Sequence, residues 1–105
     1  MIAASDVEYA ALAYPAVAEA AAVGVPDDDN VEDEVLLCVV AKPNTAVDAA
    51  ALHRFIRLRL PAFMVPRYIA VRDELPKTPS TRVQKYKLQA AGVTDAWDAR
   101  RRNRG

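Results

Sequence analysis

The sequence predicts an α+β fold with a small mixed sheet of about three strands, flanking helices and a cationic loop near the end. Apolar runs of strand length occur at 20–25 and 35–41, and the segment 67–72 has four apolar residues between two arginines. Between them, apolar residues recur at helical spacing. The 105 residues suffice for one domain with a single modest core. We therefore predict one domain over 1–99, followed by a disordered basic tail at 100–105.

The first expected element is a helix from Ser5 to about Tyr14. Ser5 and Glu8 have the spacing of a capping box, in which the Ser side chain and the Glu side chain cap the first turn. Pro15 disfavours helical geometry in the residue before it and so ends this helix. The segment 20–25 then predicts a short, largely buried strand.

The acidic stretch 27–34 separates this strand from the next. It lacks the glycine and the closing glutamate of an EF-hand, so a solvated loop is a better interpretation than a calcium site. The segment 35–41 is apolar and rich in β-branched residues, and it is the strongest strand signal in the chain. Lys42-Pro43-Asn44 ends it with turn-forming residues.

A second helix is expected to begin near Asp48, a good N-cap residue, and to end at Pro61. Its apolar stripe consists of Leu52, Phe55, Ile56 and Leu60, with His53, Arg54 and Arg57 lying off the stripe. The segment 67–72 predicts a third strand with residues 68 and 70 on one face and residues 69 and 71 on the other.

The last part of the chain begins with a polar loop at 76–82 that holds two prolines and two cations. Val83–Lys87 fits either a short strand or the start of a helix. Leu88–Ala91 predicts a last helical turn, which Gly92 ends. Residues 93–98 are expected to be irregular, with Trp97 packed against the domain.

Fourteen basic and fourteen acidic residues give a net charge of zero, which argues against nucleic acid as a partner. Residues 1–99 hold ten basic and fourteen acidic residues, and the tail holds four arginines, an arrangement typical of a solvated end. The N-terminus has no basic segment followed by a long apolar stretch, and no apolar segment approaches the length of a membrane span. These observations predict a soluble cytoplasmic protein.

Cys38 is the only cysteine and His53 the only histidine, so no disulfide can form within the chain and no metal site is predicted. Cys38 lies within the apolar run 35–40, where a thiol usually acts as a small core side chain. A catalytic pair of Cys38 and His53 is therefore a weak alternative.

Three segments, in this order, are similar to motifs of one enzyme family. They are Ile2–Glu8 continued by Tyr14–Asp27, then Phe63-Met64-Val65-Pro66-Arg67-Tyr68, and finally Leu75-Pro76-Lys77-Thr78-Pro79 with Val83-Gln84-Lys85 and Leu88. Together they resemble the small C-terminal domain of AMP-forming acyl-CoA synthetases. The ending Gly92-Val93-Thr94 with Trp97-Asp98 is similar to the crotonobetaine or carnitine CoA ligase branch.

This resemblance implies a reaction and a partner. Members of the family join a carboxylic acid to ATP, release pyrophosphate and transfer the acyl group from the adenylate to CoA, with Mg as a cofactor. The resemblance places the ATP and acid sites on a large N-terminal domain, which these residues do not supply. It also implies that the fragment alone is inactive, and that its 76–82 loop serves adenylation and another face contributes to the CoA site.

The chain departs from the family pattern in the third segment, where the family has glycine followed by the catalytic lysine. Here those positions hold Thr81 and Arg82. The family pattern thus assigns the catalytic position to Arg82, and it implies cofactor-binding positions at Lys77 and Lys85. Arginine keeps the positive charge but replaces a compact ammonium with a planar fork. Threonine is a poor substitute wherever glycine is required for a positive φ.

Two hypotheses follow for the function. One is a mobile catalytic domain of a carboxylate–CoA ligase that rotates about a hinge. The other is a noncatalytic regulatory or interaction module, which keeps the fold but has lost the catalytic lysine. In the second case Arg82, Lys77 and Lys85 are solvated surface cations.

Overall fold

The computed structural model describes residues 3–26 and 33–100. The chain forms helix α1 (Ala4–Leu12), strands β1 (Val17–Pro26) and β2 (Asp33–Ala41), helix α2 (Ala49–Arg57), a short 3-10 helix (Ala62–Met64), strand β3 (Tyr68–Arg72), helix α3 (Lys85–Ala91) and strand β4 (Trp97–Asp98). The strand order is β1-β2-β3-β4. Strands β2 and β3 are parallel, and the other two pairs are antiparallel. The predicted α+β fold with a mixed sheet is confirmed.

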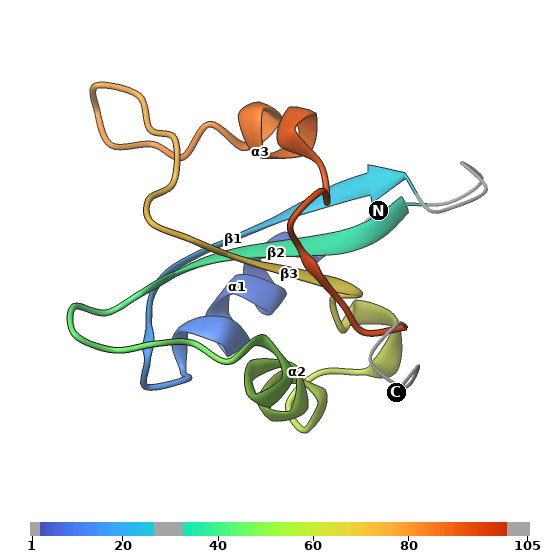
Figure 1. Cartoon of the computed structure of the whole chain (residues 1–105). Coiled ribbons are helices and arrows are strands. Elements are labelled where there is room, and N and C mark those ends of the chain that lie inside the picture. The colour runs from blue at the N-terminus through green and yellow to red at the C-terminus, as the bar shows by residue number, and fades with distance from the viewer. Residues whose placement is uncertain (1–2, 27–32, 101–105) are drawn as a thin grey trace.

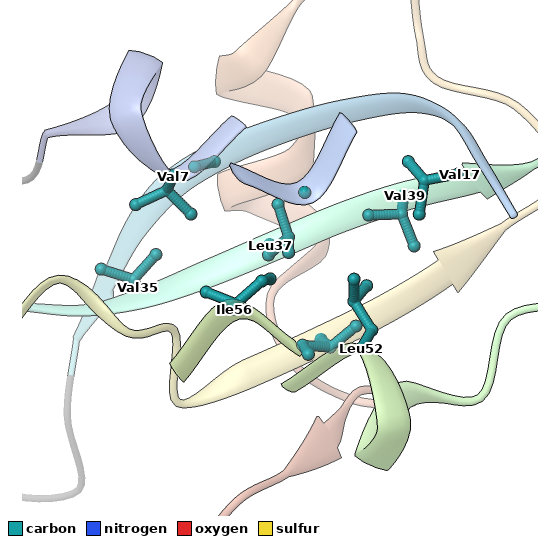
Figure 2. Packing of buried hydrophobic residues seen from close by; sticks show 10 residues of the cluster. Val7, Val17, Val35, Leu37, Val39, Leu52 and Ile56 are labelled. Atoms are coloured by element: carbon teal, nitrogen blue, oxygen red, sulfur yellow. The ribbon is translucent and has the colours of Figure 1, made fainter. Parts of the chain in front are cut away.

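Helices cover both faces of the sheet, with α1 and α2 on one face and α3 on the other (Figure 1). Strand β2 lies inside the sheet, so both of its faces are buried, which explains its continuous apolar sequence. Val35, Leu37 and Val39 point toward α1 and α2 (Figure 2). Leu36 and Cys38 join the cluster on the α3 side.

The core beneath α1 and α2 holds the side chains that the helical stripes predicted. Leu52 and Ile56 from α2 meet Val7 from α1 over Leu37 (Figure 2). Asp48 caps α2 as expected, since its carboxylate accepts a hydrogen bond from the N–H of Ala50 at 3.0 Å. This helix ends at Arg57, earlier than the predicted end at Pro61.

The predicted capping box of the first helix is wrong. Helix α1 begins at Ala4, so Ser5 lies within its first turn, and the N-cap residue, Ala3, makes no side-chain capping hydrogen bond. Glu8 instead accepts a hydrogen bond from the N–H of Ala22 on β1. The competing interaction is tertiary, because β1 is an edge strand whose outward N–H groups need acceptors.

Two strands are longer than predicted because cross-strand pairing extends them beyond their apolar residues. Val17 pairs with Ala41 across a bulge, so β1 begins before residue 20. Pro26 pairs with Asp33, so Asp33 and Glu34 belong to β2 rather than to the predicted loop. The rest of the predicted acidic loop, 27–32, lies outside the described residues, as do 101–105 of the predicted tail.

The end of the chain adds a strand within a segment that was predicted to be irregular. Trp97 and Asp98 form β4 against Ile69 and Tyr68 of β3, so the sheet has four strands rather than about three. A two-residue strand has no pattern of its own, and only pairing with β3 defines it. The neighbouring prediction for Gly92 is confirmed, since it caps α3 with a φ of 68°.

Candidate functional site

The segment between β3 and α3 folds into a tight hairpin loop. Lys77 and Val83 pair as an antiparallel bridge, and the carbonyl of Pro76 accepts a hydrogen bond from the N–H of Gln84 at 2.8 Å. The hairpin leads directly into α3 and lies at one end of the molecule, beyond the sheet (Figure 1). We call residues 76–84 the cationic loop.

Thr78 anchors the backbone of Arg82 within this loop. The N–H of Thr78 donates to the carbonyl of Arg82 at 2.8 Å, and the hydroxyl of Thr78 accepts from the N–H of Arg82 at 3.1 Å. The carbonyl of Thr78 also accepts from the N–H of Thr81 at 2.9 Å. The backbone of Arg82 is therefore held on two sides, while its side chain remains exposed.

Thr81 has a φ of 67°, in the left-handed region. A side chain with a Cβ is disfavoured there, and a β-branched one especially. This observation explains why the family pattern has glycine at this position. The turn shape is kept in this chain although its favoured residue is absent.

The three sequence-predicted cations have different surroundings. Lys77 contacts Glu19 of β1, with Nζ and Oε1 2.5 Å apart. Lys85 contacts Glu8 of α1, with Nζ and Oε2 2.6 Å apart. Within 3–26 and 33–100, Arg82 has no ion pair. It is therefore the cation of the loop that can meet an external anion without first leaving an acidic partner.

Sequence reasoning missed the role of Glu8 and overlooked Glu19. The spacing from Ser5 predicted a helix cap at Glu8, and both residues are distant in sequence from the cationic loop. Acidic residues at the edge of a sheet are common, so no pattern in the sequence distinguishes these two.

A second candidate site is an open cavity of about 610 Å³, lined by residues of α2, of the segment 60–67 and of 99–100. Its lining includes the ring of Phe63, the carboxylates of Asp33 and Glu34, and the guanidinium groups of Arg57, Arg67 and Arg100. Arg100 pairs with Glu34, and Arg67 pairs with Asp98. Phe63 is 82% exposed, so its ring is accessible from solvent beside the cavity. The exposed cation Arg57 beside an aromatic ring suits an anionic ligand that has a flat ring system.

Buried polar contacts fix one wall of this cavity. The guanidinium of Arg67 binds the carboxylate of Asp98 through two hydrogen bonds, of 3.1 and 3.2 Å. His53 was predicted to lie off the buried stripe, but it is buried and its ring lies 5.0 Å from that of Trp97. Trp97 covers it because β4 brings this side chain back over α2, a contact that no local pattern encodes.

Cys38 is not available for nucleophilic chemistry. It is buried in the cluster on the α3 side of the sheet, whereas His53 belongs to α2 on the opposite side, so the weak alternative of a catalytic pair is wrong. Burial raises the pKa of the Cys38 thiol to about 11, an effect that the charge of Arg72 partly offsets. The thiol is thus protonated near neutral pH.

Within 3–26 and 33–100, no three His, Cys, Asp or Glu side chains gather in a way that would bind a metal ion. In the same ranges, no helix is long and apolar enough to cross a membrane.

The sequence of this chain is similar to those of known enzyme domains. The family model of the AMP-binding enzyme C-terminal domain matches residues 6–82. A probable CoA ligase from Humulus lupulus is 36% identical over 80 residues, which are 76% of this chain and 15% of the relative. A 3-hydroxybenzoate–CoA ligase from Aromatoleum is 31% identical over 87 residues, or 81% of this chain and 17% of the relative.

Solved structures agree with the sequence comparison. The crystal structure of an acyl-CoA synthetase from Brucella canis superposes with a TM-score of 0.75 at 40% identity, covering 83% of this chain and 16% of that one. The chain thus spans about one sixth of the length of the proteins it matches.

Proposed function

Because the chain belongs to the family of AMP-binding enzyme C-terminal domains, we propose that it is the mobile C-terminal domain of an ATP-dependent carboxylate–CoA ligase. Its relatives are named as CoA ligases, and the matched residues make up only 15% and 17% of their length. The partner in this proposal is a large N-terminal adenylate-forming domain of the same polypeptide. The observation that carries the proposal is an exposed Arg82, without an acidic partner among the described residues, on a loop whose backbone is fixed.

In this proposal Arg82 stabilises the transition state of adenylation. Negative charge builds on the α-phosphate as the carboxylate attacks, and a positioned cation lowers the energy of that state. The guanidinium can donate two parallel hydrogen bonds to phosphate oxygens or bridge phosphate and carboxylate. Thr78 keeps the root of this side chain in place, so the loop need not reorganise during the reaction.

ATP, Mg and CoA are the small molecules that the family uses. Arg82 fits a phosphate group, so the proposal assigns it to ATP. The described residues hold no cluster of acidic side chains suited to Mg, and the proposal therefore leaves Mg to the N-terminal domain. Lys77 and Lys85 were predicted to bind cofactor, but their contacts with Glu19 and Glu8 favour a structural part in the loop.

The cavity beside α2 is the proposed contribution to the CoA site. CoA carries phosphates and an adenine ring, which match the exposed Arg57 and the exposed ring of Phe63. The cationic loop and this cavity lie in different regions of the surface, since they share no lining residue. Rotation about a hinge would let each face the N-terminal domain in turn, first for adenylation and then for thioester formation.

The proposal leaves the acid to the N-terminal domain. Relatives act on substrates as different as 3-hydroxybenzoate and oxalate, according to their names, while sharing this domain. Crotonobetaine or carnitine is the proposed acid only on the residues at 92–94 and 97–98, and the relatives named here act on other acids. The proposed location is the cytoplasm, where ATP and CoA are available.

A noncatalytic regulatory or interaction module is the second candidate. The strained Thr81 and the arginine at the family lysine position favour it, because both changes are expected where selection on catalysis has ended. The two candidates make different predictions for the same measurement.

The test is ATP–pyrophosphate exchange by the full-length protein with a panel of carboxylic acids. We expect Arg82→Ala to lower the exchange rate by about 10²- to 10³-fold, the usual effect of removing one charge-stabilising donor. Arg82→Lys should retain exchange, and the control Arg54→Ala, which removes an exposed cation from α2, should not change it. Full activity of Arg82→Ala would refute the proposed role. Absence of exchange in all variants and in the unchanged protein would support the noncatalytic module.

A further inference from the structure

Two ion pairs attach the cationic loop to the beginning of the chain. The backbone of Lys77 pairs with that of Val83 in the hairpin, and its side chain contacts Glu19 on β1. Lys85 is the first residue of α3 and contacts Glu8 on α1. Arg82 lies between these two attachment points. The ends of the loop are thus held by carboxylates, while the cation between them is exposed.

The Glu8 contact spans the edge of the sheet. Helix α1 packs on one face of the sheet and α3 on the other. Glu8 reaches the edge strand β1, where one of its carboxylate oxygens lies 2.8 Å from the N atom of Ala22 and 2.6 Å from Nζ of Lys85. The contact therefore links α1, β1 and α3 at a single carboxylate.

Isolated ion pairs at a surface stabilise a protein little, because two long side chains must lose rotamer freedom. Two features set these pairs apart. The hydrogen bond from Ala22 already orients Glu8, so less freedom remains to be lost when Lys85 binds. The two ion pairs also act on the two ends of one short hairpin. Once one pair has formed, the hairpin backbone is more ordered, so the second pair forms at a smaller cost in conformational entropy.

We propose that Glu8 and Glu19 are positioning residues that hold the cationic loop in the conformation from which Arg82 acts. Neither carboxylate is expected to touch substrate. Lys77 and Lys85 are then the loop's attachment points and not cofactor ligands. The catalytic part of this inference rests on the proposed function, whereas the ordering of the loop is a property of the domain itself.

The first test measures loop order by amide hydrogen exchange in the 105-residue chain. The reporters are the N–H groups of Thr78, Thr81, Arg82 and Gln84, which all donate within the loop. We expect Glu19→Gln to speed their exchange by about 2- to 5-fold, the range for a partly exposed ion pair, with amides of β2 unchanged. The double variant Glu19→Lys with Lys77→Glu should restore the slow exchange.

Glu8→Gln is a matched variant for the second pair. The glutamine oxygen can still accept from Ala22, so only the charge that binds Lys85 is removed. We expect the same faster amide exchange in the loop, whereas the N–H of Ala22 should exchange as slowly as in the unchanged protein. The inference would be overturned if amide exchange in the loop is unchanged in both Gln variants. It would also be overturned if the loop of the charge-swap variant exchanges as fast as that of Glu19→Gln.

The second test separates positioning from general stability in the full-length protein. Glu19→Gln should lower the kcat of ATP–pyrophosphate exchange by about 2- to 5-fold and leave thioester formation from supplied acyl-adenylate unchanged. Equal losses in both half-reactions would show a merely structural role and overturn positioning. If the unchanged protein shows no exchange, the proposed function fails, and the amide exchange still decides whether the two carboxylates order the loop.

Discussion

Replacing Thr81 with glycine should stabilise the domain. Thr81 is held at a φ of 67°, where a residue with a Cβ costs about 1–2 kcal/mol. Glycine removes this cost but gives the unfolded chain more freedom, which offsets about 0.5–1 kcal/mol. The net expectation is a gain of about 0.5–1 kcal/mol in the free energy of unfolding, or a rise of about 2–8 °C in Tm.

Equilibrium urea denaturation, followed by the fluorescence of Trp97, measures this change. Trp97 is the only tryptophan and packs against His53, so its signal reports the folded core. Thr81→Ala is the control, because alanine also loses the hydroxyl but keeps the Cβ. If the glycine variant is no more stable than the alanine variant, the strain at this position does not exist and the reasoning is wrong.

Three further predictions concern the buried parts of the domain. Asp98→Ala should lower the free energy of unfolding by about 3–5 kcal/mol, because it removes the carboxylate that accepts two hydrogen bonds from the buried guanidinium of Arg67. Denaturation midpoints should show this loss, whereas Asp95→Ala, at an exposed position nearby, should change stability by less than about 0.5 kcal/mol. Cys38 should react with a thiol reagent near neutral pH only after denaturant is added. Since folding raises its pKa from 9.0 to about 11, the unfolded chain loses this proton first, so stability should fall as pH rises from 9 to about 11. Comparison with Cys38→Ala isolates this effect, and a folded thiol that reacts readily would contradict the burial.

The main elements of the fold follow from the sequence because their signals are local. The run 35–41 contains no charged residue, which favours burial on two faces, and it forms the inner strand β2. Asp48 marks the start of α2 because a cap acts over only two or three residues. Likewise, the family pattern has glycine at the position of Thr81, and glycine is typical of a positive φ. Thr81 indeed adopts a positive φ.

The attachments between distant segments could not be predicted in this way. Glu8 has the spacing of a helix cap, yet its carboxylate binds Ala22 and Lys85, since an unpaired N–H at the edge strand and a nearby ammonium compete better for it. His53 lies next to buried Leu52 on α2, and its burial depends on Trp97 returning through β4. Only the tertiary structure brings such groups together, because their energies depend on contacts between residues that are far apart in the chain.

The sequence by itself thus determined the fold class, the family pattern and the position of Arg82, which depend on local propensities and on the order of motifs. The tertiary structure decided which cations are paired. Lys77 and Lys85 meet carboxylates from β1 and α1, whereas Arg82 meets none among residues 3–26 and 33–100. The physical reason is that charge pairing is set by distance in space, and the folding of the sheet edge against the cationic loop fixes that distance.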